Sequence, residues 1–282
     1  MKKSVFLFVC FVAAAMFFAT GCTNRDTSAA DSLLMGDSIT ADTTRMDSIT
    51  EVVEEEAMPV AADELFDDFF FNFAASRKVQ RERINFPLPV NSYGKVTEIE
   101  KGRWKRETFF MEQGYYTLIF NNYKQLRLVK DTTVNDVTVE RINVAKSSVT
   151  RWHFQRTRGL WYMVDKSVIS LKQHPDASFL SFYEQFASDA DFQTEHLAES
   201  VTFTGPDPDD DFSTMTGEIL PEQWPMFAPQ LPSGTLYNII YGAPSKKSDV
   251  RFFLIRGIAN GLQTDLVFTR KGKSWQLKKC AM

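Results

Sequence analysis

Residues 66–74 read FDDFFFNFA and residues 179–187 read FLSFYEQFA, so a run of aromatic side chains returns after 113 positions. In both runs the apolar residues follow the three- and four-residue spacing that lines one side of an α-helix. A shorter helix is expected after each, near residues 77–84 and 189–197. Asp176 or Ser178 is the expected N-cap of the second aromatic helix, and Asp189 that of the short helix after it. The two runs therefore predict two cores, each begun by helices.

The later parts of the two segments also agree. At an offset of 114, residues 154–161 and 268–275 both begin with Phe, have Arg two residues later and end with Trp. Gln80 corresponds to Gln193 at the offset of 113. This self-similarity predicts an internal duplication. Strand-like runs bounded by turn residues follow the helices in each copy, at 115–120, 134–144, 149–157 and 160–171, and at 201–204, 235–241, 250–256, 262–269 and 274–279.

Helices followed by a meander of strands are typical of an α+β fold, in which a curved sheet packs on the helices. We therefore expect two tandem cone-like repeats, each with N-terminal helices packed on a curved antiparallel sheet. Their expected boundaries are residues 64–174 and 175–282.

The first 22 residues have the order of an exported and acylated protein. Two lysines are followed by an uncharged apolar stretch at residues 5–18, and small residues precede Cys22. The stretch is too short for a membrane-spanning helix, which needs about 20 apolar residues. The end of this segment resembles the lipobox of bacterial lipoproteins. That resemblance implies a signal peptide at 1–21, lipidation of Cys22 with acyl chains such as palmitate, and, from Thr23, anchoring in the outer membrane on either its periplasmic face or the cell surface.

Residues 23–63 differ in composition from the rest of the chain. They hold ten acidic and two basic residues, a net charge of −8, and no Phe, Tyr or Trp. So little apolar surface cannot offset the entropy lost on ordering. Residues 22–63 are therefore expected to be the lipidated cysteine followed by a disordered acidic tether.

At about 110 residues each, the two copies resemble the nuclear-transport-factor-2-like (NTF2-like) fold, a cystatin-like α+β cone. With the lipobox and the acidic tether, the chain resembles exported bacterial lipoproteins of a family known only as a domain of unknown function. The resemblance implies a cone that often holds a ligand or an active site in its open mouth. It carries no catalytic residue that could be transferred to this sequence.

The residues most often used in sites give few candidates. Cys10 leaves with the signal peptide and Cys22 would be acylated, so Cys280 has no disulfide partner in the mature chain. We interpret Cys280 as a filler in the last strand, with a reactive thiol as the alternative. His153, His174 and His196 have no recognisable partner, and the carboxylates of residues 207–211 lack the spacing of a calcium loop. No catalytic residue, metal site or cofactor is predicted.

Two tryptophans are the candidate ligand contacts. Trp104 and Trp224 lie in the less regular middle of each copy, where the mouth of a cone is expected, and their rings suit stacking on a sugar or another ligand. Packing in the core is the alternative reading for both.

The charge divides unevenly between the copies. Residues 64–176 hold 19 basic and 13 acidic residues, net +6, and residues 177–282 hold 9 and 13, net −4. The copies are expected to attract each other, or the first to face an anionic glycan or membrane surface. Nucleic acid is not expected as a partner of an exported protein.

These features favour a noncatalytic envelope lipoprotein, held to the membrane by its lipid. The expected partner is a small molecule, a glycan or another envelope protein. The alternatives are a cone-fold isomerase or hydrolase and a pure scaffold.

Overall fold

A computed structural model describes residues 65–207, 209–242, 248–258 and 260–282. We call residues 65–174 the first half and residues 175–282 the second half. The helices and 3₁₀ turns are α1 (Phe66–Ala75), α2 (Arg77–Glu82), η2 (Lys101–Arg103), η3 (Tyr123–Lys130), η4 (Leu171–Gln173), α3 (Ala177–Ser188), α4 (Ala190–Glu195) and α5 (Trp224–Phe227). The strands are β1 (Leu88–Ser92), β2 (Lys95–Ile99), β3 (Tyr115–Phe120), β4 (Asp136–Asn143), β5 (Ser148–Thr157), β6 (Leu160–Ser170), β7 (Leu197–Asp207), β8 (Asp210–Ile219), β9 (Thr235–Tyr241), β10 (Val250–Gly257), β11 (Gln263–Lys271) and β12 (Ser274–Ala281).

Both aromatic helices and all nine expected strands are present, so the predicted α+β class is confirmed. Asp189 caps α4 as expected, because its side chain accepts the N–H of Phe192 at 3.0 Å. Asp176 lies at the N-cap of α3 without a capping hydrogen bond. Strands β1, β2 and β8 were not expected, and β2 is exposed along most of its length, so it lacks the alternation that marks a strand.

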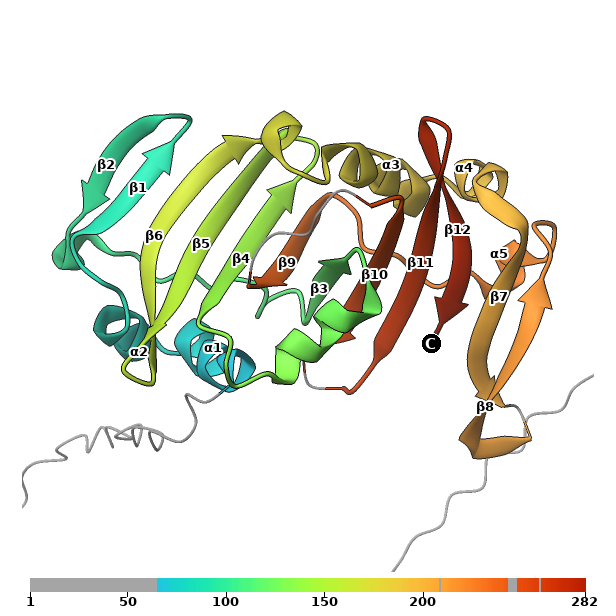
Figure 1. Ribbon diagram of the computed structural model, residues 1–282, viewed down its shortest axis with the longest axis horizontal. Helices are drawn as coiled ribbons and strands as arrows, with labels where there is room; N and C mark the ends of the chain where they lie inside the picture. Colours follow the sequence, from blue (N-terminus) through green and yellow to red (C-terminus); the bar gives the residue numbers. More distant parts are fainter. Residues whose placement is uncertain (1–64, 208, 243–247, 259) are drawn as a thin grey trace, which may run out of the picture. The chain divides into compact units, whose positions relative to one another are not determined.

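All twelve strands belong to one curved sheet (Figure 1), in the order β2-β1-β6-β5-β4-β9-β3-β10-β11-β12-β7-β8. Most neighbours are antiparallel, as expected, but β1–β6, β7–β12 and β3–β9 are parallel. The sheet is therefore mixed rather than a simple antiparallel meander.

The halves exchange strands at the centre of this sheet. Strand β9 of the second half pairs with β4 of the first, from Val137↔Tyr241 to Asn143↔Thr235. Strand β3 of the first half pairs with β10 of the second, from Phe120↔Phe252 to Tyr115↔Gly257. Between them, β3 and β9 meet only at Thr117↔Asn238. The proposed boundary between residues 174 and 175 stays a prediction, but the sheet is continuous across it.

Two hydrophobic cores lie on opposite faces of the sheet. Leu118 and Leu254 belong to the core of α1, whereas the adjacent residues Ile119 and Phe253 belong to the core of α3. Successive residues of a strand point to opposite faces, so the two cores must be separated by the sheet. Each core also takes residues from both halves, and Tyr241 of β9 donates a hydrogen bond to Asp67 of α1.

Equivalent aromatic residues make matching contacts in the two halves. Phe66 meets Trp161 edge-on with ring centroids 5.1 Å apart, and Phe179 meets Trp275 edge-on at 5.3 Å. Fully burying one such aromatic side chain contributes about 1.5–3 kcal/mol. These contacts agree with the sequence offsets, while the origin of the chain by duplication of a cone stays a prediction.

The expected signal peptide, Cys22 and the acidic tether lie outside the described residues. Within the described part of the chain, no helix combines the length and the apolar character needed to cross a membrane.

Candidate functional site

Polar side chains share one face of the sheet where β9, β4, β5 and β6 run side by side. One row across these strands consists of Asn238, Glu140, Arg151 and Ser167. The next row consists of Ile240, Thr138, His153 and Asp165. Residues two apart on a strand point to the same face, so both rows lie together on the side opposite the α1 core.

Glu140 is the buried centre of the first row. Its carboxylate is 0% exposed and accepts Arg151 Nε at 2.7 Å and Asn238 Nδ2 at 3.2 Å. His174 Nε2 lies 3.2 Å from both carboxylate oxygens. Burial alone would raise the pKa of Glu140, but the hydrogen bond from His174, the charge of Arg151 and the hydrogen bond from Asn238 hold that pKa below its usual value. Glu140 is therefore ionised at neutral pH.

The bonds around His174 assign its tautomer. The backbone N–H of Asp176 donates to Nδ1 at 3.0 Å, so Nδ1 carries no proton and the Nε2–H donates to Glu140. Arg151 balances the charge of Glu140. The Asp176 carboxylate accepts Arg251 of β10 at 2.6 and 2.8 Å. Residues 174–176 thus tie β4 of the first half to β10 of the second.

His153 lies in the second row between two carboxylates. Its Nε2 is 2.7 Å from Asp136 Oδ2 and its Nδ1 is 2.8 Å from Asp165 Oδ2. Partial burial alone would lower the pKa of His153, but the bonds to Asp136 and Asp165 outweigh it and raise that pKa above its usual value. Both ring nitrogens can donate at once only in the imidazolium form, so the geometry favours a charged His153.

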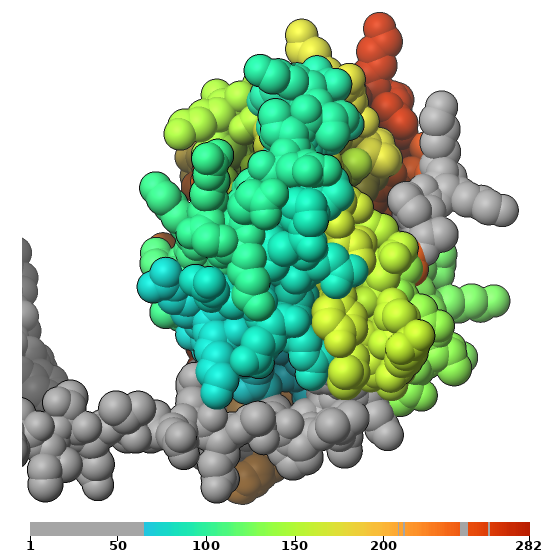
Figure 2. Space-filling model, turned by 90° about the vertical axis from the view of Figure 1, so that its left-hand side faces the viewer, coloured from blue at the N-terminus to red at the C-terminus, as the bar shows by residue number. Residues whose placement is uncertain are grey.

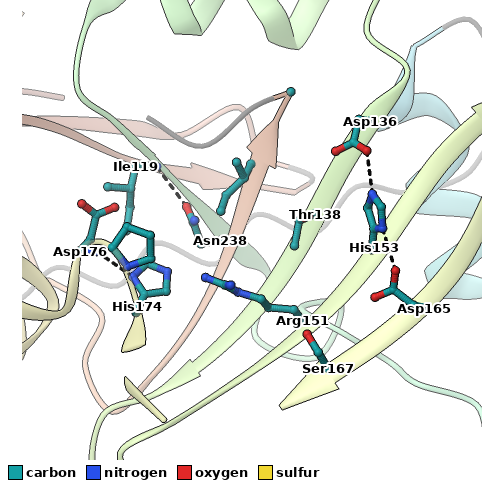
Figure 3. A pocket seen from close by; sticks show the side chains of 13 residues that line it. Ile119, Asp136, Thr138, Arg151, His153, Asp165, Ser167, His174, Asp176 and Asn238 are labelled. Atoms are coloured by element: carbon teal, nitrogen blue, oxygen red, sulfur yellow. Dashed lines mark hydrogen bonds and ion pairs between the residues drawn. The ribbon is translucent and has the colours of Figure 1, made fainter. Parts of the chain in front are cut away.

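A cavity of about 410 Å³ opens over these rows, between the sheet and residues 174–176. Figure 3 shows the Arg151 side chain reaching into it, between His174 and Asn238 on one side and His153 on the other. Among the described residues, only Nε of the Arg151 guanidinium has a hydrogen-bond partner. Both Nη groups are therefore available to a ligand, and the hydroxyls of Thr138 and Ser167 line the same cavity.

The charged residues of the two rows all come from the first half. At the offset of 114, Glu140 corresponds to Leu254 and His153 to Val267. Strands with the same place in the sheet can therefore carry apolar residues at these positions. The fold can therefore form without buried charge at these positions. Because the charge is not needed for the fold, we take the cavity that it lines as the candidate site.

The family model for DUF4348, a domain of unknown function, matches residues 45–282. This chain belongs to the DUF4348 family. A solved structure of an NTF2-like protein from Bacteroides fragilis NCTC 9343 is similar to it, with 35% sequence identity and a TM-score of 0.73. The match covers 80% of this chain and 98% of the other. The fold of this DUF4348 protein is thus NTF2-like, and no curated protein matches the chain.

The tryptophans that were candidate ligand contacts are buried in this DUF4348 protein. Trp104 is 4% exposed and donates its indole N–H to Gln80, and Trp224 is 1% exposed and donates to Gln193. The two glutamines are 113 positions apart and the two tryptophans 120 positions apart. Neither tryptophan ring lines the cavity beside Arg151. Cys22 lies outside the described residues.

Cys280 is buried in the α3 core at 1% exposure, and burial raises its pKa to about 12. Its thiol therefore stays protonated at neutral pH, as expected of a filler rather than a reactive cysteine. Among the described residues, no group of three His, Cys, Asp or Glu side chains is placed to hold a metal ion.

The sequence-based view that His153 and His174 have no partners is wrong. His153 lies between two aspartates and His174 binds Glu140. A signal was present on β5, where Arg151 and His153 alternate with the buried residues Trp152 and Phe154. Charged residues that alternate with buried aromatic residues along a strand indicate a polar site on the other face of that strand.

We expect His153 to make the stability of the domain depend on pH. The pKa of His153 is raised in the folded protein. Its contribution to the free energy of unfolding is therefore complete below the unfolded pKa of about 6.5 and is lost as pH rises through the folded pKa. We expect the free energy of unfolding in urea to fall between about pH 6 and 8.5 by about 0.5–1 kcal/mol more in the wild type than in the His153→Gln variant. A constant difference across this range would contradict the charged state assigned to His153.

Proposed function

We propose that this protein is a lipid-anchored protein of the bacterial outer membrane that binds a small ligand with an anionic group. The acyl anchor rests on the order of charged, apolar and small residues before Cys22. The binding role rests on the cavity over β4, β5 and β6. In this proposal the described domain carries the binding site and residues 22–63 connect it to the membrane.

One observation carries the binding role, namely the guanidinium of Arg151. The buried Glu140 holds its Nε edge, so the group is fixed without losing its other donors. A guanidinium presents paired N–H groups that match a carboxylate or phosphate in a bidentate geometry. Because Arg151 is pre-positioned, a ligand would not have to pay the entropy of ordering it.

The other lining groups restrict the ligand further. Thr138 and Ser167 offer hydroxyls, and Asp136 and Asp165 each have one carboxylate oxygen that His153 does not use. Ile240 and Pro175 add apolar surface. A small carboxylate that also carries hydroxyl or amino groups would use both the donors and the acceptors, and the volume suits a ligand of modest size.

Titration calorimetry with gluconate, succinate and inorganic phosphate tests the binding role. We expect at least one of these probes to bind the wild type and to lose about tenfold or more in affinity with Thr138→Val or Ser167→Ala, which remove one hydrogen bond each. Arg151→Gln should abolish binding, and Arg127→Gln, on the exposed η3 turn, is the matched control. Equal affinities in all variants, or no binding of any probe, would contradict the proposal.

Replacement of Cys22 tests the anchor. We expect the wild type to incorporate labelled palmitate and to fractionate with membranes, because two or more acyl chains hold a protein firmly to a bilayer. Cys22→Ser should lose the label and leave the membrane fraction, whereas Cys280→Ser should keep both. Retention of Cys22→Ser in the membrane, in its folded form, would show that another element holds the protein there.

A further inference from the structure

The two ends of the twelve-stranded sheet carry opposite charge. Residues 77–106, which form α2, β1, β2 and η2, hold nine basic and three acidic residues, net +6. Residues 190–219 lie 113 positions later and form α4, β7 and β8. They hold eight acidic residues and no Lys or Arg, net −8. Strands β2 and β8 are the two edges of the sheet, so Figure 1 shows these segments at opposite ends.

The positive charge gathers on one surface, which we call the basic end. Arg77, Lys78, Arg81 and Lys101 surround a hollow in which Glu82 is the sole acidic lining residue. None of these four cations forms an ion pair with any described residue. Figure 2 looks onto this end of the domain. The equivalent helix α4 has Ala190, Asp191 and Thr194 in place of the three basic residues of α2, so the fold does not need them.

The negative charge lies on the other hairpin, which with α4 we call the acidic end. Asp191, Glu195, Glu199, Asp209, Asp210 and Glu218 are exposed there. Side-chain hydrogen bonds occupy some of these oxygens, for example between Glu218 and Thr202 at 3.0 Å, but no described cation forms an ion pair with any of them. The acidic end is thus a surface of unneutralised carboxylates.

Both ends also expose an edge strand and apolar side chains. In the basic end Tyr93 is 64% and Val96 is 67% exposed, and in the acidic end Phe212 is 100% and Met215 is 50% exposed. An edge strand presents unpaired backbone N–H and C=O groups, which soluble proteins normally protect. Lys95 on β2 and Glu218 on β8 place opposite charges on the two free edges.

We infer that the basic end of one molecule binds the acidic end of another, with β2 of the first beside β8 of the second. The partner is a second copy of this chain, because the chain itself supplies both complementary surfaces. Such a contact is heterologous, so each added molecule leaves one basic and one acidic end free. Assembly should therefore continue into open chains and not stop at a dimer. Opposite charge guides the encounter and the backbone edges can then pair.

Sedimentation velocity on full-length protein carrying Cys22→Ser, which prevents acylation, tests this inference. At about 20 mM NaCl the average mass should rise with concentration beyond that of a dimer, and at about 500 mM NaCl it should fall to that of a monomer because salt screens exposed charges. A basic-end variant (Arg77→Glu, Lys78→Glu, Arg81→Glu) and an acidic-end variant (Asp191→Lys, Glu195→Lys, Glu199→Lys) should each associate at least about tenfold more weakly.

Mixing the two variants gives the sharper result. The basic-end variant keeps its acidic end and the acidic-end variant keeps its basic end, so these two native surfaces can still meet. The two changed ends have lost most of the charge that attracts their native partners. The mixture should therefore associate more strongly than either variant does alone. Lys271→Glu with Lys273→Glu is the control and should assemble like the wild type, because Lys271 is exposed at the end of β11 and Lys273 is exposed in the turn before β12.

Three results would overturn the inference. These are a wild type that stays monomeric at low salt, a dimer that neither variant weakens, and a mixture that associates no more strongly than either variant alone. Binding of the monomeric wild type to vesicles containing phosphatidylglycerol, lost in the basic-end variant, would assign the basic end to a membrane surface instead. Thermal unfolding of each variant distinguishes lost contact from lost folding.

Discussion

Replacing Glu140 with Ala should lower the free energy of unfolding by about 3–5 kcal/mol, the usual cost of removing one partner of a buried ion pair. Glu140 is 0% exposed and receives hydrogen bonds from Arg151, His174 and Asn238. Its removal would leave a cation and two polar groups without their acceptor in the sheet. Since the whole domain is expected to be stable by only about 5–15 kcal/mol, this loss would be a large fraction of the total.

Urea unfolding monitored by circular dichroism would measure the effect. Glu98→Ala, on the exposed strand β2, is the matched control and should change stability by no more than about 0.5 kcal/mol. The pKa of Glu140 is lowered in the folded protein. Its contribution to the free energy of unfolding is therefore present above the unfolded pKa of about 4.3 and is lost as pH falls through the folded pKa. A loss below about 1 kcal/mol at neutral pH would show that the cluster tolerates the change and that Arg151 is not held by Glu140.

Neither half of the domain should fold when produced separately as residues 64–174 or 175–282. The first half alone lacks β9, which pairs with β4 at seven positions. Its core also loses Tyr237, Ile239 and Tyr241. The second half alone lacks β3, the partner of β10. Exposed core and unpaired strand edges lead to unfolding or aggregation rather than to a smaller stable domain.

Co-expression provides the test of this second prediction. Each half alone should be insoluble or unfolded by circular dichroism, whereas the two together should form a soluble 1:1 complex with the spectrum of the intact chain. A folded, monomeric half would contradict the importance of the exchanged strands. In that case the two halves would behave as the independent domains that the boundary at residues 174 and 175 predicts.

Much of the secondary structure could be predicted from the sequence. The aromatic spacing located α1 and α3, because a helix with one buried face repeats with the period of its own backbone. Strand-like runs bounded by turn residues located nine strands. The hairpin strands β2 and β8 are exposed over most of their residues, so they have no such repeat. Pro89 further weakens the strand signal of β1.

The candidate site was harder to predict because its members are far apart in the sequence. Glu140 and Arg151 come from adjacent strands, but His174 lies 34 residues and Asn238 98 residues from Glu140. Each of these residues alone resembles an ordinary polar residue of a strand or loop. Only the registers of β4, β5, β6 and β9 bring them into shared rows.

Four features could be predicted from the sequence alone, namely the α+β class, the two aromatic helices, the similarity at offsets of 113 and 114, and the burial of Cys280. These features depend on short-range spacing and on the transfer of apolar side chains from water, which act on each segment separately. Three other features became known only from the folded structure. Strand β9 lies between β4 and β3, and the two cores occupy opposite faces of one sheet. A charged cluster is buried where the halves meet. Backbone hydrogen bonding allows a strand many partners, so the choice among them is made by the packing of the whole chain.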